Sequence, residues 1–269
     1  MGAGITHVFL AAASPVTIVE SGADAADLAR ERVAASVRKA EELGKLPDGV
    51  TANVLVADLR TTTSLDDLGH RARLVVEAVP EDVGLKQRML VAAERALPDA
   101  DLATNTSALP VAEIADALDR PERLVGMHFF NPVPASALVE VVRHDRVDDA
   151  VVARTQARVE RLGLTPVTVR DSPGFATSRL GVAVGLEAIR MLEDGVASAE
   201  DIDTAMRLGY RWPIGPLRLT DLVGLDVRLA VAEHLTRTLG PRFTPPQLLR
   251  DMVARGELGK KSGRGFHAW

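Results

Sequence analysis

The stretch "MGAGITHVFLAAASPVTIVE", residues 1–20, decides the fold class of this chain. It has the pattern of a helix that starts on Gly2 and Gly4, followed by a β-rich run that ends in the acid Glu20. Glycines at a helix start expose N–H groups to a pyrophosphate, and an acid after the next strand can bind an adenosine ribose. The stretch therefore predicts the end of a dinucleotide-binding fingerprint, although an ordinary helix start and a solvated glutamate stay possible on these residues alone. An acid at position 20 disfavours a 2′-phosphate, which favours NAD over NADP.

Strand and helix patterns alternate through the first part of the chain. Strands are predicted at 53–57, 74–79, 102–103, 124–129, 138–142 and 166–169, and helices at 2–13, 24–43, 82–96 and 148–162. From residue 175 onward only helical patterns remain, at 175–193, 198–208, 216–239 and 245–255, with Ser198 and Asp201 as an N-cap pair. We predict an α/β Rossmann-type doubly wound sheet over residues 1–172, which binds NAD, and an all-α substrate and dimerisation domain over 173–269.

The composition excludes several classes of function. The chain has 269 residues, a net charge of −5 and no cysteine, so disulfides, thiolate metal sites and a cysteine nucleophile are excluded. The negative charge gives no support to a nucleic-acid partner, and no apolar run reaches the roughly 18 residues of a membrane span. No basic region precedes the apolar N-terminal stretch, which is therefore a poor match to the pattern of a signal peptide. We expect a cytoplasmic protein without a metal site or a membrane partner.

A second stretch, "NTSALPVAEIADALDRPERLVGMHFFNPVPASALVEVV" at residues 105–142, is much more specific. It closely resembles the L-3-hydroxyacyl-CoA dehydrogenases, including their 3-hydroxybutyryl-CoA members. The segments "DSPGFATSRL", "DIDTAMRLGYRWPIGPLRLTDLVGLD" and "GKKSGRGF" resemble the same family, in the same order. The resemblance thus covers nearly the whole chain.

The resemblance implies an alcohol oxidation in which His128 takes a proton while hydride leaves for the nicotinamide. Histidine suits this step because its pKa lies near neutrality, and Glu140 would fix its tautomer. The family pattern further implies a substrate contact from Ser107 and cofactor contacts from Asn131, Glu81, Lys86 and Lys261. Taken singly, a histidine is more often structural, and each of these charged residues could be a solvated surface group.

Ser178 departs from the family pattern, which has asparagine at this position. In the family that amide helps to hold the substrate oxygen near the catalytic histidine. A serine hydroxyl is shorter, so Ser178 would act through a water molecule. Loss of a donor aimed at a reacting oxygen can lower the rate on the order of a hundredfold.

The front of the dinucleotide fingerprint, a strand and a glycine pair, does not precede Met1. In a doubly wound sheet the first strand is central, so its loss would hold the flanking strands about 9–10 Å apart. We expect the working protein to carry about 10–15 further upstream residues that supply this strand. Otherwise the structure should show an empty slot beside residues 16–20, or another segment in it, together with weak cofactor binding.

The function expected from these observations is reversible NAD-dependent oxidation of (S)-3-hydroxyacyl-CoA to 3-oxoacyl-CoA, with a short acyl chain. One alternative is a pathway-specific dehydrogenase of an acyl-carrier-protein thioester. Another is a degenerate, non-catalytic member of the family that binds an acyl thioester. The apolar content of residues 217–239 and the family resemblance predict a homodimer formed through the helical domain.

Overall fold

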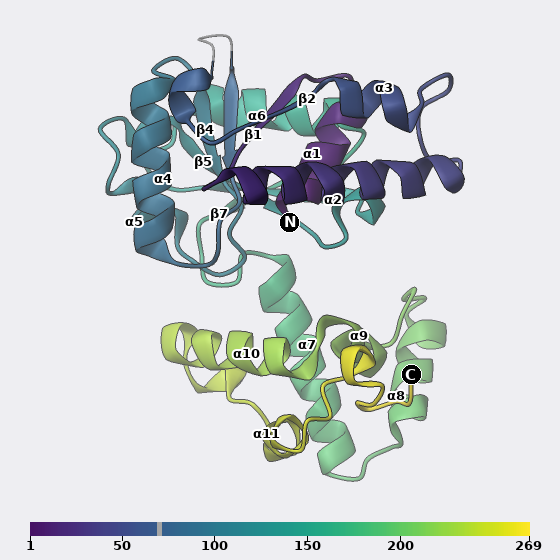
Figure 1. Cartoon of the computed structure of the whole chain (residues 1–269). Coiled ribbons are helices and arrows are strands. Elements are labelled where there is room, and N and C mark those ends of the chain that lie inside the picture. The colour runs from purple at the N-terminus through teal and green to yellow at the C-terminus, as the bar shows by residue number, and fades with distance from the viewer. Residues whose placement is uncertain (69–71) are drawn as a thin grey trace. The chain divides into compact units, whose positions relative to one another are not determined.

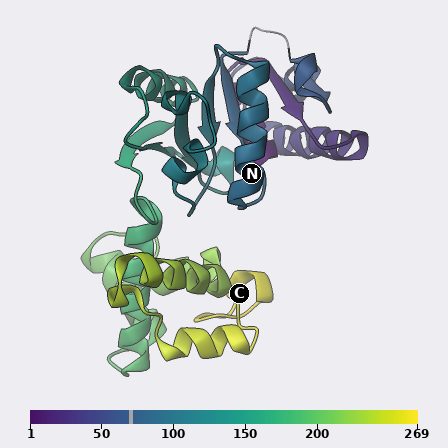
Figure 2. The ribbon, with the colours of Figure 1, turned by 90° about the vertical axis from the view of Figure 1, so that its left-hand side faces the viewer.

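The computed structural model describes residues 1–68 and 72–269. The chain divides into two compact units, Met1–Asp171 and Ser172–Trp269 (Figure 1). The first unit is an α/β domain, and the second consists of helices joined by short loops (Figure 2). Among the described helices, none is long and apolar enough to cross a membrane.

The strands of the first unit form two sheets. In the smaller sheet, β1 (Val16–Val19) pairs in parallel with β2 (Leu59–Thr62). The larger sheet has the order β3-β4-β5-β6-β7 and is parallel except for the β5–β6 pair. Its strands are β3 (Leu74–Glu77), β4 (Asp101–Thr104), β5 (Leu124–Phe129), β6 (Leu138–Arg143) and β7 (Thr165–Arg170). The expected doubly wound sheet is therefore observed in two parts.

The division of the sheet falls beside β1, where a slot was expected. β1 pairs with β2 and not with β3, and within residues 1–68 and 72–269 no strand pairs with the second edge of either β1 or β3. Each of these edges carries backbone N–H and C=O groups without a strand partner, which is where a sheet can accept a further strand. The expectation that a further strand lies between β1 and β3 stays a prediction.

Six α-helices belong to the first unit: α1 (Gly2–Ala11), α2 (Ala23–Glu42), α3 (Ala52–Ala57), α4 (Val83–Ala96), α5 (Val111–Ala115) and α6 (Asp149–Arg161), counted over the described residues. The strand predicted at residues 53–57 is wrong, because this segment is the helix α3 and the strand β2 follows it. Thr51 caps α3 by accepting a hydrogen bond from the Val54 amide at 3.4 Å. Ala52 and Leu55 are buried at helical spacing, so packing outweighs the β-propensity of the valines.

Buried hydrophobic residues support both sheets. The core of the larger sheet includes Met127 and Phe129 of β5 and Val139 and Val141 of β6. A Cβ atom at Gly126 would lie 2.6 Å from the Val142 Cβ, so only glycine permits the close approach of β5 and β6 at this point. In the register of this pair, His128 of β5 lies opposite Glu140 of β6.

The second unit contains α7 (Thr177–Glu193), α8 (Ala199–Gly209), α9 (Pro216–Val223), α10 (Leu225–Leu239) and α11 (Gln247–Ala254). The single helix predicted at 216–239 is wrong, because Gly224 interrupts it with a φ of +100° that favours glycine. The predicted N-cap of α8 is confirmed, since the Ser198 hydroxyl accepts from the Asp201 amide at 3.1 Å.

Two buried carboxylates attach the C-terminal tail to the helices of the second unit. Asp221 of α9 accepts from the Phe266 amide, the His267 amide and the Trp269 indole, each at 2.9 Å. Asp203 of α8 accepts from the His267 ring at 2.8 Å and from the first two amides after Pro216 in α9. The tail is therefore an integral part of this unit.

Candidate active site

Several of the polar residues expected at the site lie at one end of the larger sheet. β3, β4 and β5 are parallel, so the segments that follow Glu77, Thr104 and Phe129 lie at the same edge. β6 runs the other way, which places its first residues at that edge too. In open α/β sheets this carboxyl edge is where ligands bind.

His128 and Glu140 lie directly opposite each other on β5 and β6. The His128 Nδ1 is 2.7 Å from the Glu140 Oε2, and the two side chains are 8% and 0% exposed. The carboxylate therefore favours the imidazole tautomer with a proton on Nδ1. The Nε2 atom then carries a lone pair and is the nitrogen that can accept a proton. The Phe130 ring, with its centroid 4.5 Å from that of His128, also limits the orientation of the imidazole.

Glu81 organises the loop that follows β4. Its Oε1 accepts from the Ser107 amide at 2.7 Å, the Thr106 hydroxyl at 2.8 Å and the Ser107 hydroxyl at 3.1 Å. Burial opposes ionisation of Glu81, but these hydrogen bonds and Lys86 outweigh it and hold the pKa of this carboxyl below its usual 4.5. The structure thus joins two of the predicted site residues, Glu81 and Ser107.

Lys86 is wholly buried beneath this loop. Its Nζ lies 2.9 Å from the Glu77 Oε1 and 3.3 Å from the Glu81 Oε2, and it also donates to the Val79 carbonyl at 3.2 Å. The Thr104 hydroxyl donates to the Glu77 Oε2 at 2.6 Å. Lys86 therefore connects the ends of β3 and β4, rather than lying on the surface as a solvated charge.

Three residues of this network were absent from the predicted site: Glu77, Thr104 and Asn105. The Asn105 Oδ1 accepts from the Phe129 amide at 3.0 Å and so ties the end of β4 to the end of β5. The sequence does contain a signal for Glu77, which ends the apolar run "LVVE". A carboxylate at the end of a buried strand needs a cation beside it. Lys86 supplies that cation.

The start of α1 has features that fit an anionic cofactor group. Its N-cap, Met1, makes no side-chain hydrogen bond, and the first turn contains no acid. The first helical N–H groups are therefore suited to a pyrophosphate. Gly4 also has a packing role, because a Cβ there would lie 3.0 Å from the Val133 Cβ in η3 (Val133–Ala135). The Gly4 amide itself donates to the Met1 carbonyl at 2.9 Å, so the phosphate contacts of Gly2 and Gly4 stay predictions.

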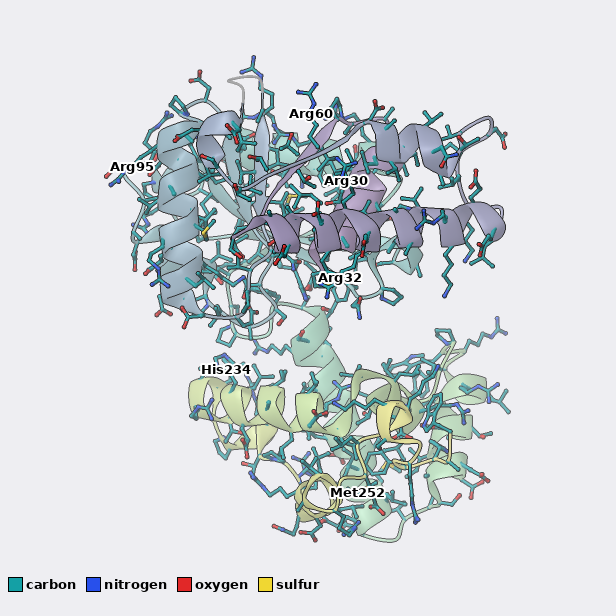
Figure 3. The ribbon with its side chains drawn as sticks, viewed as in Figure 1. Arg30, Arg32, Arg60, Arg95, His234 and Met252 are labelled. Atoms are coloured by element: carbon teal, nitrogen blue, oxygen red, sulfur yellow. The ribbon has the colours of Figure 1, made fainter. Side chains whose placement is uncertain are left out.

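Glu20 follows β1 directly, and its amide continues the β1–β2 pairing by donating to the Thr62 carbonyl at 3.0 Å. Its side chain is half-buried, at the position expected for a ribose contact. Arg30 of α2, labelled in Figure 3, donates from its Nη2 to the Leu59 carbonyl of β2 at 2.6 Å. Asn131 is exposed immediately after β5.

The two remaining predicted residues belong to the second unit. Ser178 is the second residue of α7, at the start of the first helix of this unit as expected. Lys261 forms an ion pair with Asp226, with its Nζ 2.6 Å from the Oδ2. Burial acts against the charge of Asp226, but Lys261 and backbone N–H groups hold its pKa below the usual value. The contacts of Ser178 and Lys261 with substrate and cofactor stay predictions.

Comparisons with known proteins agree with this arrangement. The family model "3-hydroxyacyl-CoA dehydrogenase, NAD binding domain" matches residues 1–172, and the C-terminal domain model of the same family matches residues 174–269. A 3-hydroxybutyryl-CoA dehydrogenase of Mycobacterium tuberculosis is 42% identical and covers 100% of this chain and 95% of its own. The mitochondrial hydroxyacyl-coenzyme A dehydrogenase of Rattus norvegicus is 36% identical and covers 100% of this chain and 88% of its own.

Solved structures give the same result. The (S)-3-hydroxybutyryl-CoA dehydrogenase of Ralstonia eutropha superposes with a TM-score of 0.92 at 37% identity, over 100% of this chain and 95% of that chain. The 3-hydroxybutyryl-CoA dehydrogenase of Escherichia coli gives a TM-score of 0.93 at 35% identity, over 100% of this chain and 57% of that chain. The chain belongs to the 3-hydroxyacyl-CoA dehydrogenase family.

Proposed function

We propose that this protein catalyses the reversible oxidation of an (S)-3-hydroxyacyl-CoA to the 3-oxoacyl-CoA with NAD. The observation that carries the proposal is the buried pair of His128 and Glu140, 2.7 Å apart, at the ligand-binding edge of an α/β sheet. Membership in the family and the match to its NAD-binding domain support the choice of cofactor. The names of the relatives support a short acyl chain.

In the mechanism that we infer, His128 is the general base. Its Nε2 takes the proton of the 3-hydroxyl group, while Glu140 stabilises the imidazolium that forms. NAD, when bound, accepts the hydride that leaves C3 of the substrate. In the reverse direction the protonated His128 returns the proton to the oxygen.

The other site residues hold substrate and cofactor in this scheme. Ser107, fixed by Glu81, contacts the substrate oxygen, and Ser178 acts from the second unit. Gly2, Gly4 and Glu20 bind the adenosine diphosphate half of NAD. Asn131 contacts the nicotinamide half, and Glu81 and Lys261 occupy family positions near the cofactor. The wholly buried Lys86 acts there through Glu81, to which its Nζ is paired at 3.3 Å. Each role follows from the family pattern at that position, and single substitutions with separate NADH-binding and turnover assays test it.

Turnover of acetoacetyl-CoA with NADH tests the proposal. We expect His128→Gln to lower kcat by about 10²–10⁴-fold, because a positioned general base contributes this much. Glu140→Gln should lower kcat by about 10³–10⁴-fold, since the wrong tautomer is then favoured. His234→Gln, in the other unit, is the matched control and should keep the wild-type rate. A His128→Gln protein that retains more than about a tenth of kcat contradicts the base assignment.

Two further measurements decide between this function and its alternatives. NADH fluorescence separates the enzyme from a degenerate binding protein, because ordinary NADH affinity with turnover excludes the latter. A comparison of kcat/KM for acetoacetyl-CoA and an acetoacetyl-carrier-protein identifies the thioester carrier. We also propose a homodimer formed through the second unit and a cytoplasmic location. Light scattering at micromolar concentration tests the dimer, and cell fractionation tests the location.

A further inference from the structure

Arg228 of α10 is a buried cation that the scheme above does not use. It is only 5% exposed, and among the described residues nothing accepts a hydrogen bond from its Nε. Burial lowers its pKa to about 10, and no neighbouring carboxylate acts against this shift. No carboxylate among the described residues offsets the desolvation of this guanidinium, so an anion bound beside it would be stabilising.

The side chain of Arg228 runs along α7 toward the N-terminal end of that helix. A Cβ at Gly185 would lie 3.5 Å from the Nε, and a Cβ at Gly181, one turn earlier, would lie 3.5 Å from the Nη1. Ser178 precedes Gly181 by three residues, so all three small residues lie on one face of α7. The guanidinium therefore points along this face toward Ser178.

The groups beside Arg228 offer it no counter-charge. The Thr220 hydroxyl, next to Gly185, donates to the Pro216 carbonyl at 2.9 Å. The Nη1 of the guanidinium lies beside half-buried Gly181, where a Cβ at that position would lie 3.5 Å from it.

We propose that Arg228 binds a carboxylate at the end of the substrate's acyl chain, so that the preferred substrate is a 3-hydroxyacyl thioester with a terminal carboxylate. The inference rests on the proposed function, because the substrate contact of Ser178 places the acyl chain on this face of α7. A guanidinium and a carboxylate form two parallel hydrogen bonds in a fixed geometry. The short side chain of Ser178 lies on the same face.

The wild-type protein gives the first test, with NADH and two substrates of equal carbon number. We expect kcat/KM for 3-oxoadipyl-CoA, which ends in a carboxylate, to exceed that for 3-oxohexanoyl-CoA about 10- to 100-fold. Equal values, or a preference for the neutral substrate, overturn the inference while the proposed function stands. Absence of turnover with acetoacetyl-CoA as well overturns the proposed function and this inference with it.

Variants of Arg228 test whether this residue causes the preference for the substrate with a terminal carboxylate. Arg228→Met should lower the ratio of the two kcat/KM values about 10- to 100-fold, and Arg228→Lys should keep part of it, because lysine retains the charge without the fork. Arg237→Met is the matched control, since Arg237 is exposed on the same helix and should leave the ratio at the wild-type value. If Arg228→Met leaves the ratio unchanged but weakens the dimer by light scattering, the arginine belongs to a subunit contact and the inference is wrong. If Arg228→Met does not fold, the wild-type comparison decides.

Discussion

Lys86 and Arg228 are both buried cations, but their surroundings differ completely. Lys86 is 0% exposed and has two carboxylates, Glu77 and Glu81, within 3.3 Å of its Nζ. Arg228 is 5% exposed, and its Nε has no acceptor among the residues that the structure describes. The charge of Lys86 is neutralised by the fold itself, whereas the charge of Arg228 is not. A buried cation that is paired within the protein, like Lys86, stabilises the loops of a site. A buried cation without such a partner, like Arg228, is suited to binding an anionic ligand.

The largest effect on stability is expected for Lys86→Met. This change leaves Glu77 buried beside an apolar side chain, and removal of one partner of a buried ion pair costs about 3–5 kcal/mol in the free energy of unfolding. Urea unfolding at neutral pH measures the loss. Lys39→Met, at an exposed position of α2, is the control and should change stability by less than about 0.5 kcal/mol. A loss of under about 1 kcal/mol for Lys86→Met would show that the network contributes little.

Arg228→Met should change stability in the opposite direction. Methionine fills much of the same volume without a charge to desolvate, so we expect a gain of about 1–3 kcal/mol in the absence of substrate. Urea unfolding of the unliganded protein measures this change as well. A loss of more than about 3 kcal/mol would mean that Arg228 has a partner within the protein, and the contrast with Lys86 would then disappear.

Glu81→Gln sharpens the comparison on the Lys86 side. The amide oxygen can still accept from the Ser107 amide, but the charge is lost, so we expect a loss of about 1 kcal/mol at pH 7. The pKa of Glu81 lies below its usual 4.5 in the folded state. Its contribution is therefore complete above that pH and is lost as the pH falls through the folded pKa. The difference between wild type and variant should shrink below pH 4.5, and a difference independent of pH would contradict the assignment.

The sequence predicts the site better than it predicts these buried charges. The resemblance places His128 and Glu140 as partners, and the structure brings them to 2.7 Å across one strand pair. The pattern at 53–57 misled the prediction because valines occur in both strands and short buried helices. Arg237 of the same helix is exposed, whereas the burial of Arg228 depends on Gly181 and Gly185 in a different helix. Contacts between helices distant in the chain leave no local pattern in the sequence.

His7 represents a third way to bury a titratable group, in which the group stays neutral. It is 4% exposed in α1, and its Nδ1 lies 2.7 Å from the Ser36 hydroxyl oxygen. Burial lowers the pKa of His7 from 6.5, with no carboxylate to oppose it. Since the unfolded chain then binds a proton that the folded state does not, the free energy of unfolding should fall as the pH drops below 6.5.

For one proton this slope is limited to about 1.4 kcal/mol per pH unit. We expect His7→Gln, which keeps a hydrogen-bonding group toward Ser36, to reduce the slope between pH 6.5 and pH 5.5. His144, whose pKa is also lowered mainly by burial, should supply the part that remains. Urea unfolding of wild type and variant across this range measures the effect. An unchanged slope in His7→Gln would mean that His7 takes up its proton without leaving the folded state, and that burial alone does not keep a side chain uncharged in this protein.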